Sequence, residues 1–404
     1  MKIGILTYHW VPNFGAQMQT FASVCRLRAM GHEPVVLDWR PADAEIRYMA
    51  GIPPMQLEQH NVFAQSFPLS PLCRTQAEVD GIARDMGLRG ILVGSDSLFN
   101  LTRAQFSFRR LRWIPPTSDH IFPNLFWEPT SVENIPYAAI SVSSQNSNYH
   151  RFADQRKTIA SALKRFCYVS VRDEWTRKLV AYFTDGAVMP SVTPDPVFSM
   201  EQNHVTIPPK GEILSRFGLP EHYVLMSACG RPRTSITSKW QRGFIQAAKR
   251  EGLTCVEFPR AQGCQQLKTK IRIALPLSPL DWYALIRYSS GFVGMLMHPL
   301  IVALHNAVPC FSFDIYGISR GLHLDRESSK IYLLLKELGL EGNRCSVADI
   351  FSWPRPERVL EILLSFDRES CRVQMKNRSR ACVSNYERAV AALGDFPENR
   401  NLAP

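Results

Sequence analysis

The sequence predicts an α/β protein built from two facing Rossmann-like domains. Three observations support this class: the chain of 404 residues is too long for one compact core, strands alternate with helices in both halves, and a polar, Pro-rich stretch at 205–210 separates the halves. Alternation of this kind indicates parallel sheets. We expect the first domain at 1–204, the second at 205–375, and a C-terminal helix and tail at 376–404.

The first half begins with an apolar strand at 3–7, followed by a loop at 8–15 and a helix to about residue 30. Gly31 suits the left-handed residue that ends many helices. The apolar face expected on this helix comprises Met18, Phe21, Cys25 and Ala29. Further strands are expected at 34–38, 90–93, 136–142 and 166–171, with 41–80 as an irregular, Pro-rich insertion.

The second half repeats the alternation of strands and helices. Its expected strands are 223–228, 254–258, 292–295 and 310–313. Its expected helices are 240–251, 278–289 and one that opens at His298, and the stretch 355–393 also has a helical pattern. Residues 394–404 form a polar tail.

Bulk composition is that of a globular protein, with 45% hydrophobic and 21% charged residues. The net charge of +11 favours an anionic partner such as a phosphate ester or an anionic lipid surface, although many enzymes are simply basic. No run of five or more Lys and Arg residues occurs, so we expect no nucleic-acid-binding arm.

Targeting and redox signals point to the cytoplasm. The N-terminal apolar segment is too short for a signal peptide, and no apolar run reaches the roughly 18 to 20 residues of a membrane span. The ten cysteines are scattered, without C-x-x-C pairs or zinc-ligand spacing. We therefore expect reduced thiols and no metal site or bound cofactor.

Polar residues follow several strands, where ligands bind in open α/β sheets. Asn13, Gly15 and Gln17 lie between the first strand and its helix, and form either a substrate-binding lip or a plain cap and turn. Asp96 leaves a buried strand, and is either a general base or the cap of a following helix. Arg172 also leaves a buried strand, and either clamps an anion or makes an ion pair or structural link.

Two histidines lie near the strand at 292–295. His298 opens a helix, where exposed N–H groups favour an anion and the imidazole can exchange a proton beside it; the alternative is a structural histidine. His305 falls at the helical spacing of the apolar residues in that helix, so we expect its side chain to pack among them.

Together these segments resemble the polysaccharide pyruvyl transferase family. The matching stretches, in the family's order, are 5–8 with 13–20, Gly94-Ser95-Asp96, Ser170-Val171-Arg172-Asp173-Glu174, Asp195-Pro196-Val197-Phe198, and 278–281 leading to 292–295 with His298. The resemblance implies a GT-B-like pair of domains. It also implies transfer of pyruvate from phosphoenolpyruvate to a sugar, usually as a cyclic ketal on two hydroxyls.

The resemblance also implies roles for individual residues. Asp96 would be the base or the carboxylate that orients the acceptor, His298 the proton donor and Arg172 a ligand of the donor. Ser95 and Ser144 would contact substrate; for Ser144 a surface turn is the alternative. Many family members carry Arg-Leu-His where this chain has Leu296-Met297-His298. Arg231 and Arg233 are the candidates that would replace the missing arginine.

We therefore expect a cytoplasmic pyruvyltransferase with phosphoenolpyruvate as donor and a saccharide or glycolipid-linked acceptor. The first domain would hold the acceptor and the second the donor, with peripheral contact to an anionic membrane as a further expectation. Two alternatives remain: a glycosyltransferase that uses a nucleotide sugar, and a non-catalytic family member that binds a phosphorylated ligand. The oligomeric state does not follow from the sequence.

Overall fold

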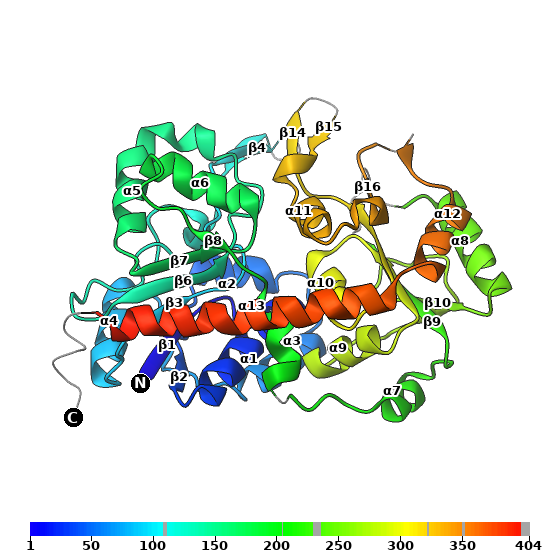
Figure 1. The fold of residues 1–404 in the computed structure, drawn as a ribbon, viewed down its shortest axis with the longest axis horizontal. Helices are drawn as coiled ribbons and strands as arrows, with labels where there is room; N and C mark the ends of the chain where they lie inside the picture. Colours follow the sequence, from blue (N-terminus) through cyan, green and yellow to red (C-terminus); the bar gives the residue numbers. More distant parts are fainter. Residues whose placement is uncertain (108–110, 204, 229–235, 321–322, 350–351, 397–404) are drawn as a thin grey trace.

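The computed structural model describes residues 1–107, 111–203, 205–228, 236–320, 323–349 and 352–396. Two six-stranded sheets, each entirely parallel, form the two halves of the molecule (Figure 1). The first has the order β2 (Glu33–Val36), β1 (Lys2–Leu6), β3 (Ile91–Val93), β6 (Tyr137–Val142), β7 (Tyr168–Val171) and β8 (Ser191–Val192). The second has the order β11 (Ile271–Arg272), β10 (Thr254–Glu257), β9 (Tyr223–Ser227), β12 (Gly291–Gly294), β13 (Cys310–Asp314) and β16 (Arg344–Ser346).

Helices connect the strands in both halves. Those of the first half are α1 (Phe14–Ala29), α2 (Ala42–Met49), α3 (Pro54–Ala64), α4 (Gln76–Asp85), α5 (Arg156–Lys164) and α6 (Glu174–Thr184). Those that follow are α7 (Lys210–Phe217), α8 (Ser238–Arg250), α9 (Pro279–Arg287), α10 (Met297–His305), α11 (Lys330–Glu337), α12 (Pro356–Leu364) and α13 (Arg368–Gly394).

Short elements complete the fold. The 3₁₀ helices are η1 (Ser118–His120), η2 (Tyr149–Gln155), η3 (Pro196–Asn203), η4 (Arg326–Ser328) and η5 (Glu341–Asn343). Two antiparallel hairpins pair β4 (Gln105–Ser107) with β5 (Arg112–Ile114), and β14 (Ile318–Arg320) with β15 (His323–Asp325). The strands predicted from the sequence are confirmed to within about two residues at each end, which is the usual uncertainty of such boundaries.

One local prediction in the first half is wrong, and another is only partly right. The stretch 41–80 is not irregular, because it contains α2, α3 and the start of α4, whose N-terminus carries a full capping box between Thr75 and Glu78. The helix face predicted for α1 is only partly right: Met18 is buried and Phe21 packs against the core, but Ala29 is exposed, and residues on other sides of the helix, such as Ala22 and Val24, are also buried. The reason is that α1 is covered from several sides, by α3, α9, α10, α13 and η3.

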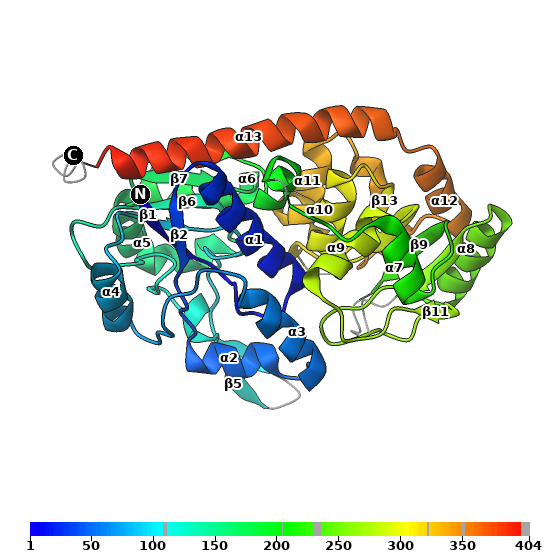
Figure 2. The ribbon, with the colours of Figure 1, turned by 90° about the horizontal axis from the view of Figure 1, so that it is seen from below.

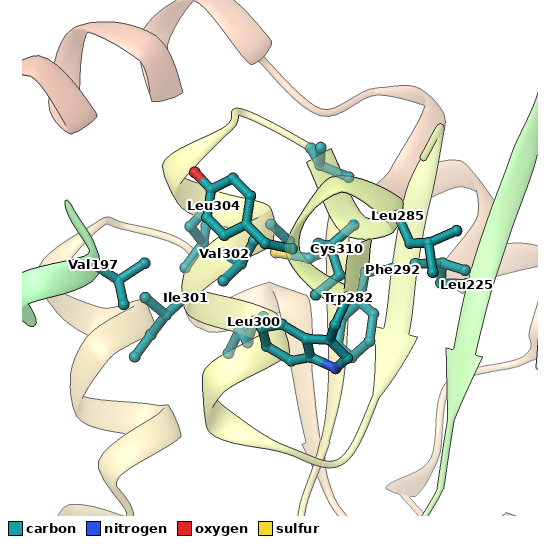
Figure 3. Packing of buried hydrophobic residues seen from close by; sticks show 14 of the residues in the cluster. Val197, Leu225, Trp282, Leu285, Phe292, Leu300, Ile301, Val302, Leu304 and Cys310 are labelled. Carbon is teal, nitrogen blue, oxygen red and sulfur yellow. The ribbon is translucent and has the colours of Figure 1, made fainter. Parts of the chain in front are cut away.

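A continuous apolar core joins the two halves. One buried cluster contains Phe14 and Met18 of α1, Val197 of η3 and many side chains of α9 and α10. Figure 3 shows part of this cluster, with Leu300 and Ile301 on α10 and the indole of Trp282 beside Leu300. The rings of Phe14 and Trp282 stack across the junction with their centroids 5.4 Å apart. The halves are therefore packed against each other rather than joined only by the chain.

The long helix α13 reinforces this junction. It begins in the second half, passes α10 and η3, and ends against β6 and β7 of the first sheet (Figures 1 and 2). Its Tyr386 is buried and exchanges a hydrogen bond with Ser23 of α1 at 2.7 Å. Of the helices in the described ranges, none combines the length and the apolar composition that a bilayer span requires. The cysteines in those ranges are all free thiols.

Candidate functional site

A cavity of about 380 Å³ lies between the carboxyl ends of the two sheets. Its first-half wall includes Tyr8, which follows β1, and Asp96, which follows β3. These two strands are neighbours, although the chain runs from β1 to β2 before it crosses to β3, so they flank the switch point of the sheet. The second-half wall includes Arg260 after β10 and His298 after β12. Switch points at carboxyl ends are where open α/β sheets bind ligands.

Asp96 is held by an unusual backbone. An ideal Cβ on Gly94 would lie 2.1 Å from the carbonyl oxygen of Ile140, so only glycine fits there. Asp96 itself has φ of +107°, a strained value for a residue with a side chain, and such strain is found mainly at functional sites. Its Oδ1 accepts a hydrogen bond from the Ser97 amide at 2.7 Å, and no helix follows it, so the helix-cap alternative is wrong.

Arg172 lies behind Asp96 rather than in the cavity. Its Nη1 is 3.0 Å from Oδ2 of Asp195 and its Nη2 is 3.6 Å from Oδ1 of Asp96, and its side chain is only 4% exposed. The neighbouring Asp173 is occupied elsewhere, since it caps α6 and accepts a hydrogen bond from Ser143. The ion pairs fit the structural alternative for Arg172, which holds two carboxylates, and donor binding by Arg172 stays a prediction.

His298 reaches the cavity from the first turn of α10 and packs against the other half. An ideal Cβ on Gly15 would lie 2.0 Å from Cγ of His298, so the ring rests directly on the backbone of α1. Its Nε2 is buried and has no hydrogen-bond partner among the described residues. Burial lowers the pKa of His298, and the charges of Asp96 and Asp195 offset this only in part.

Asp96 and His298 thus line one cavity from opposite halves. Burial alone would raise the pKa of Asp96, but the charge of His298, when it is protonated, and the charges of Arg172 and Lys330 outweigh burial and hold this pKa below its usual value. The carboxylate is therefore ionised at neutral pH and able to accept a proton. The convergence of a carboxylate and an imidazole, which sequence order alone could only suggest, is present.

Two cations complete the cavity, and the sequence analysis identified neither. Lys330 is the first residue of α11 and is 7% exposed, and its Nζ lies 4.3 Å from the centre of the Tyr316 ring. Burial, followed by the charge of Arg172, lowers the pKa of Lys330 to about 8. Arg260 comes just after β10. Asp96 and Arg172 were selected because they follow strands, and the same criterion could also have selected Arg260. Lys330 follows no sheet strand and gave no such signal.

A polar aromatic wall lies beside Asp96. The hydroxyls of Tyr8 and Tyr48 both donate to Oδ2 of Asp119, at 2.6 and 2.9 Å, and His120 Nε2 lies 3.4 Å from the Tyr48 hydroxyl. Burial raises the pKa of both tyrosines, so they remain neutral hydrogen-bond donors. Tyr8, Tyr48 and His120 border the cavity, whereas Asp119 is buried behind them and holds them in place.

Several residues predicted to bind substrate make hydrogen bonds within the protein. Gln17 is buried and exchanges hydrogen bonds with His60, with Nε2 donating to the His60 carbonyl at 2.9 Å. Ser95 donates to the carbonyl of Ser141 at 2.6 Å, and Ser144 lies within 3.1 Å of the Thr176 hydroxyl. Gln17, Ser95 and Ser144 are not among the residues that line the cavity, and their substrate contacts stay predictions.

The other predicted residues have mixed outcomes. Asn13 caps α1, accepting a hydrogen bond from the Gly15 amide at 3.0 Å, so the cap is confirmed; it also lines the cavity, and its contact with substrate stays a prediction. Gly15 supports His298 rather than binding a ligand. Leu296 lies on the cavity wall beside His298. Arg231 and Arg233 fall outside the described residues.

His305 packs as expected, against Phe198 and Tyr283, at centroid distances of 6.0 and 6.4 Å. Within the described ranges, no group of three or more His, Cys, Asp or Glu side chains has the arrangement of a metal site.

Solved structures with the same architecture define the class of fold. UDP-GlcNAc 2-epimerase from Methanocaldococcus jannaschii is similar over 94% of this chain and all of its own, with TM-score 0.54 and 10% identity. UDP-N-acetylglucosamine 2-epimerase from Rickettsia bellii is similar over 99% of this chain and 98% of its own, with TM-score 0.53 and 12% identity. UGT89C1 from Arabidopsis thaliana, complexed with UDP-L-rhamnose, is similar over 97% of this chain and 98% of its own, with TM-score 0.53 and 10% identity. The fold is of the GT-B type, as expected.

Within this class, the family follows from the sequence. The family model for polysaccharide pyruvyl transferase matches residues 13–315, which is most of the chain and includes Asp96 and His298. The protein belongs to the polysaccharide pyruvyl transferase family. No curated protein matches the chain significantly.

Proposed function

We propose that this protein transfers pyruvate from phosphoenolpyruvate to hydroxyl groups of a saccharide. The observation that carries the proposal is the shared cavity of Asp96 and His298, which also contains the cations of Lys330 and Arg260. An ionised carboxylate, an imidazole and cationic groups are the set that this reaction needs, and family membership supports the same reaction type.

The proposed reaction begins at the double bond of phosphoenolpyruvate. His298 gives a proton to the methylene carbon, and a sugar hydroxyl attacks the adjacent carbon while Asp96 takes the hydroxyl proton. The bond from this carbon to the phosphate oxygen then breaks, and inorganic phosphate leaves. Asp96 passes the proton that it took to the departing phosphate. A second hydroxyl of the sugar then attacks the same carbon and closes the ketal, and its proton returns to His298, so that both residues regain their starting states. Each step needs a group that can give or accept a proton, and the cations stabilise the departing phosphate.

The proton on His298 depends on the donor in this scheme. In the empty cavity, burial lowers the pKa of His298 and favours the neutral imidazole. A bound dianion would favour the imidazolium, because opposite charges a few ångströms apart raise the pKa of the base. His298 would therefore take up its proton when phosphoenolpyruvate binds, and it would stay neutral in the empty cavity.

The acceptor would lie against the wall formed by Tyr8, Tyr48 and His120. Neutral hydroxyls and an imidazole suit the many hydroxyls of a sugar, and aromatic rings suit its apolar faces. Because this wall belongs to the first half and the cations belong to the second, the expected division into acceptor and donor sides is retained in the proposal.

Release of phosphate from phosphoenolpyruvate in the presence of a pyruvylatable saccharide tests the proposal. We expect Asp96→Asn and His298→Gln each to reduce phosphate release at least 100-fold, since each removes a proton-transfer group. Asp185→Asn and His222→Gln are matched controls at exposed sites far from the cavity and should retain the wild-type rate. Unchanged rates in both site variants would reject these roles.

A second candidate is a glycosyltransferase that uses a nucleotide sugar. It is favoured by one observation, the likeness of this fold to UGT89C1 complexed with UDP-L-rhamnose and to Staphylococcus aureus MnaA in a co-structure with UDP. Calorimetric competition separates the two candidates. If a UDP-sugar binds and phosphoenolpyruvate fails to displace it, the second candidate is favoured and the first is rejected.

A further inference from the structure

A β-hairpin stands apart from both large sheets of the protein. It is formed by β4 and β5, which have three residues each, and no residue of either strand is buried. Figure 2 shows β5 at the outer edge of the first half, on the side opposite α13. The chain segment that contains the hairpin begins after Ser97 and ends before His120, and both of these residues line the cavity. The hairpin is therefore an insertion between two parts of the cavity wall.

One face of the hairpin is aromatic and exposed. Phe106 and Trp113 are paired across the two strands with their ring centroids 5.6 Å apart, and they are 40% and 66% exposed. Leu111, just before β5, is 78% exposed. A two-stranded hairpin has no core of its own in which such side chains could be buried. Large apolar side chains that gather on one exposed feature are typical of a surface that binds a partner or a membrane.

The same segment is positively charged. Residues 97–118 include four arginines and neither Asp nor Glu. Arg112 belongs to β5 and is exposed. Arg103 instead holds the base of the hairpin, where it forms an ion pair with Asp154 and lies 4.8 Å from the centre of the Phe152 ring. The hairpin thus combines exposed aromatic rings with a cationic charge that favours an anionic partner.

We infer that this hairpin binds the surface of an anionic lipid bilayer, with Phe106 and Trp113 in the head-group region and Arg112 at the lipid phosphates. Tryptophan is enriched at the interface between lipid and water, because its ring is apolar and its N–H group is polar. The long side chain of arginine reaches head groups from beside an inserted aromatic residue. Burial of apolar area and attraction to anionic lipid then act together.

A second copy of the chain is a less suitable partner. A stable protein–protein interface buries about 800 Å² on each partner. Strands of three residues offer much less than this area. Two copies of a segment that carries only positive charges would also repel each other.

The position of the hairpin relates membrane binding to the cavity. His120 follows Ile114, the last residue of β5, by six residues, which span at most about 20 Å of extended chain. A bilayer bound by the hairpin would therefore lie near the wall that contains His120 and Tyr48. A lipid-linked saccharide as the acceptor follows from this position and rests on the proposed function, whereas membrane binding can be measured without any transfer.

Sedimentation of the full chain with vesicles tests the inference. The protein should bind vesicles of phosphatidylglycerol and phosphatidylcholine at least tenfold more tightly than vesicles of phosphatidylcholine alone. We expect Trp113→Ser and Arg112→Glu each to weaken binding to the anionic vesicles at least fivefold. The controls are Val373→Ser and Arg380→Glu, at exposed positions of α13 on the opposite side of the molecule (Figure 2). Both controls should bind within twofold of the wild type.

Brominated lipids separate insertion from simple attraction between charges. Bromine on the acyl chains quenches the fluorescence of a tryptophan only when the indole is close to it. The wild type should be quenched when it binds such vesicles. Trp113→Phe keeps an aromatic ring and should still bind, but it should lose most of the quenching. Equal quenching in the wild type and Trp113→Phe would show that Trp113 does not enter the bilayer and would overturn the inference.

The remaining outcomes separate the inference from the proposed function. A wild type that binds neither kind of vesicle, or equal binding by Trp113→Ser and Val373→Ser, would overturn the inference. A dimer seen by light scattering and abolished in Trp113→Ser, without vesicle binding, would overturn it in favour of a second copy. Transfer to a soluble saccharide should be unchanged in Trp113→Ser. Vesicle binding that depends on Trp113, without any pyruvyl transfer, would leave the inference standing and reject the proposed function.

Discussion

The imidazole of His298 rests on the backbone of Gly15, so that the two halves of the protein touch at the wall of the cavity. A methyl group on Gly15 would lie 2.0 Å from Cγ of His298, far inside contact distance. Gly15 belongs to the first turn of α1 and His298 to the first turn of α10, so two helix N-termini meet at this point. The position of the ring is therefore set by both halves together.

Gly15→Ala should displace the ring of His298 and reduce pyruvyl transfer about 100-fold, because a misplacement of about 1 Å can have that effect on a reaction. Steady-state kinetics would measure it. The matched control is Gly81→Ala in α4, where an added methyl group meets no atom within 4 Å. That variant should keep full activity and gain about 0.5–1 kcal/mol of stability. Full activity in Gly15→Ala would contradict the assigned role of the contact.

Arg172→Met should lower the free energy of unfolding by about 3–5 kcal/mol, since it leaves the carboxylate of Asp195 buried without its cation. Urea unfolding would measure this loss, and the double variant Arg172→Met with Asp195→Leu should recover much of it. Arg177→Met is the control, because its pair with Glu174 is about 40% exposed on both sides and contributes less than about 1 kcal/mol. Equal losses in Arg172→Met and Arg177→Met would refute the interpretation.

Acid should destabilise the protein partly through His60. Burial lowers the pKa of His60 to about 4, whereas an unfolded histidine has a pKa of about 6.5. The unfolded chain therefore binds the proton first, and stability that is complete above pH 6.5 is lost as the pH falls towards 4, by about 3 kcal/mol. The slope of unfolding free energy against pH should be smaller in His60→Asn than in the wild type. His222→Gln, at an exposed site, should keep the wild-type slope.

Leu296→Arg should tighten phosphate binding about tenfold or more, because it adds a cation to the cavity wall beside His298. Calorimetry with inorganic phosphate would measure the gain. Leu296→Met, which preserves size and apolar character, is the control and should bind as the wild type does. An arginine variant no tighter than the methionine variant would show that position 296 does not face the bound anion.

The sequence predicted most strands of the two parallel sheets, because buried parallel strands such as Ile91–Val93 and Tyr137–Val142 are short apolar runs, but it missed the short edge strands β8, β11 and β16. It failed for 41–80, where prolines at helix starts, such as Pro54 in α3, were taken for breaks in structure. It was only partly right for α1, whose surroundings are formed by distant parts of the chain.

The candidate site was predictable only in part, for a related reason. Asp96 and His298 follow strands that can be located from the sequence, so both could be proposed. Lys330, Tyr48 and His120 lie in segments that do not directly follow a strand of either sheet. Only the folding of the chain brings them to the cavity, so no sequence signal pointed to them. Arg172 was predicted to bind the donor. An arginine at a strand end has the same sequence pattern whether its partner is a substrate or a carboxylate of the protein, and here it pairs with Asp195.

The course of α13 has a consequence for how the cavity can admit a sugar. A helix of 27 residues is about 40 Å long, and this one is anchored at both ends, near α10 and against β6 and β7. Movement that separated the two halves evenly would have to break this helix or detach it. A bulky acceptor can enter more easily if one half rotates relative to the other about an axis close to α13. Such a rotation opens the cavity at one edge, while the opposite edge stays closed.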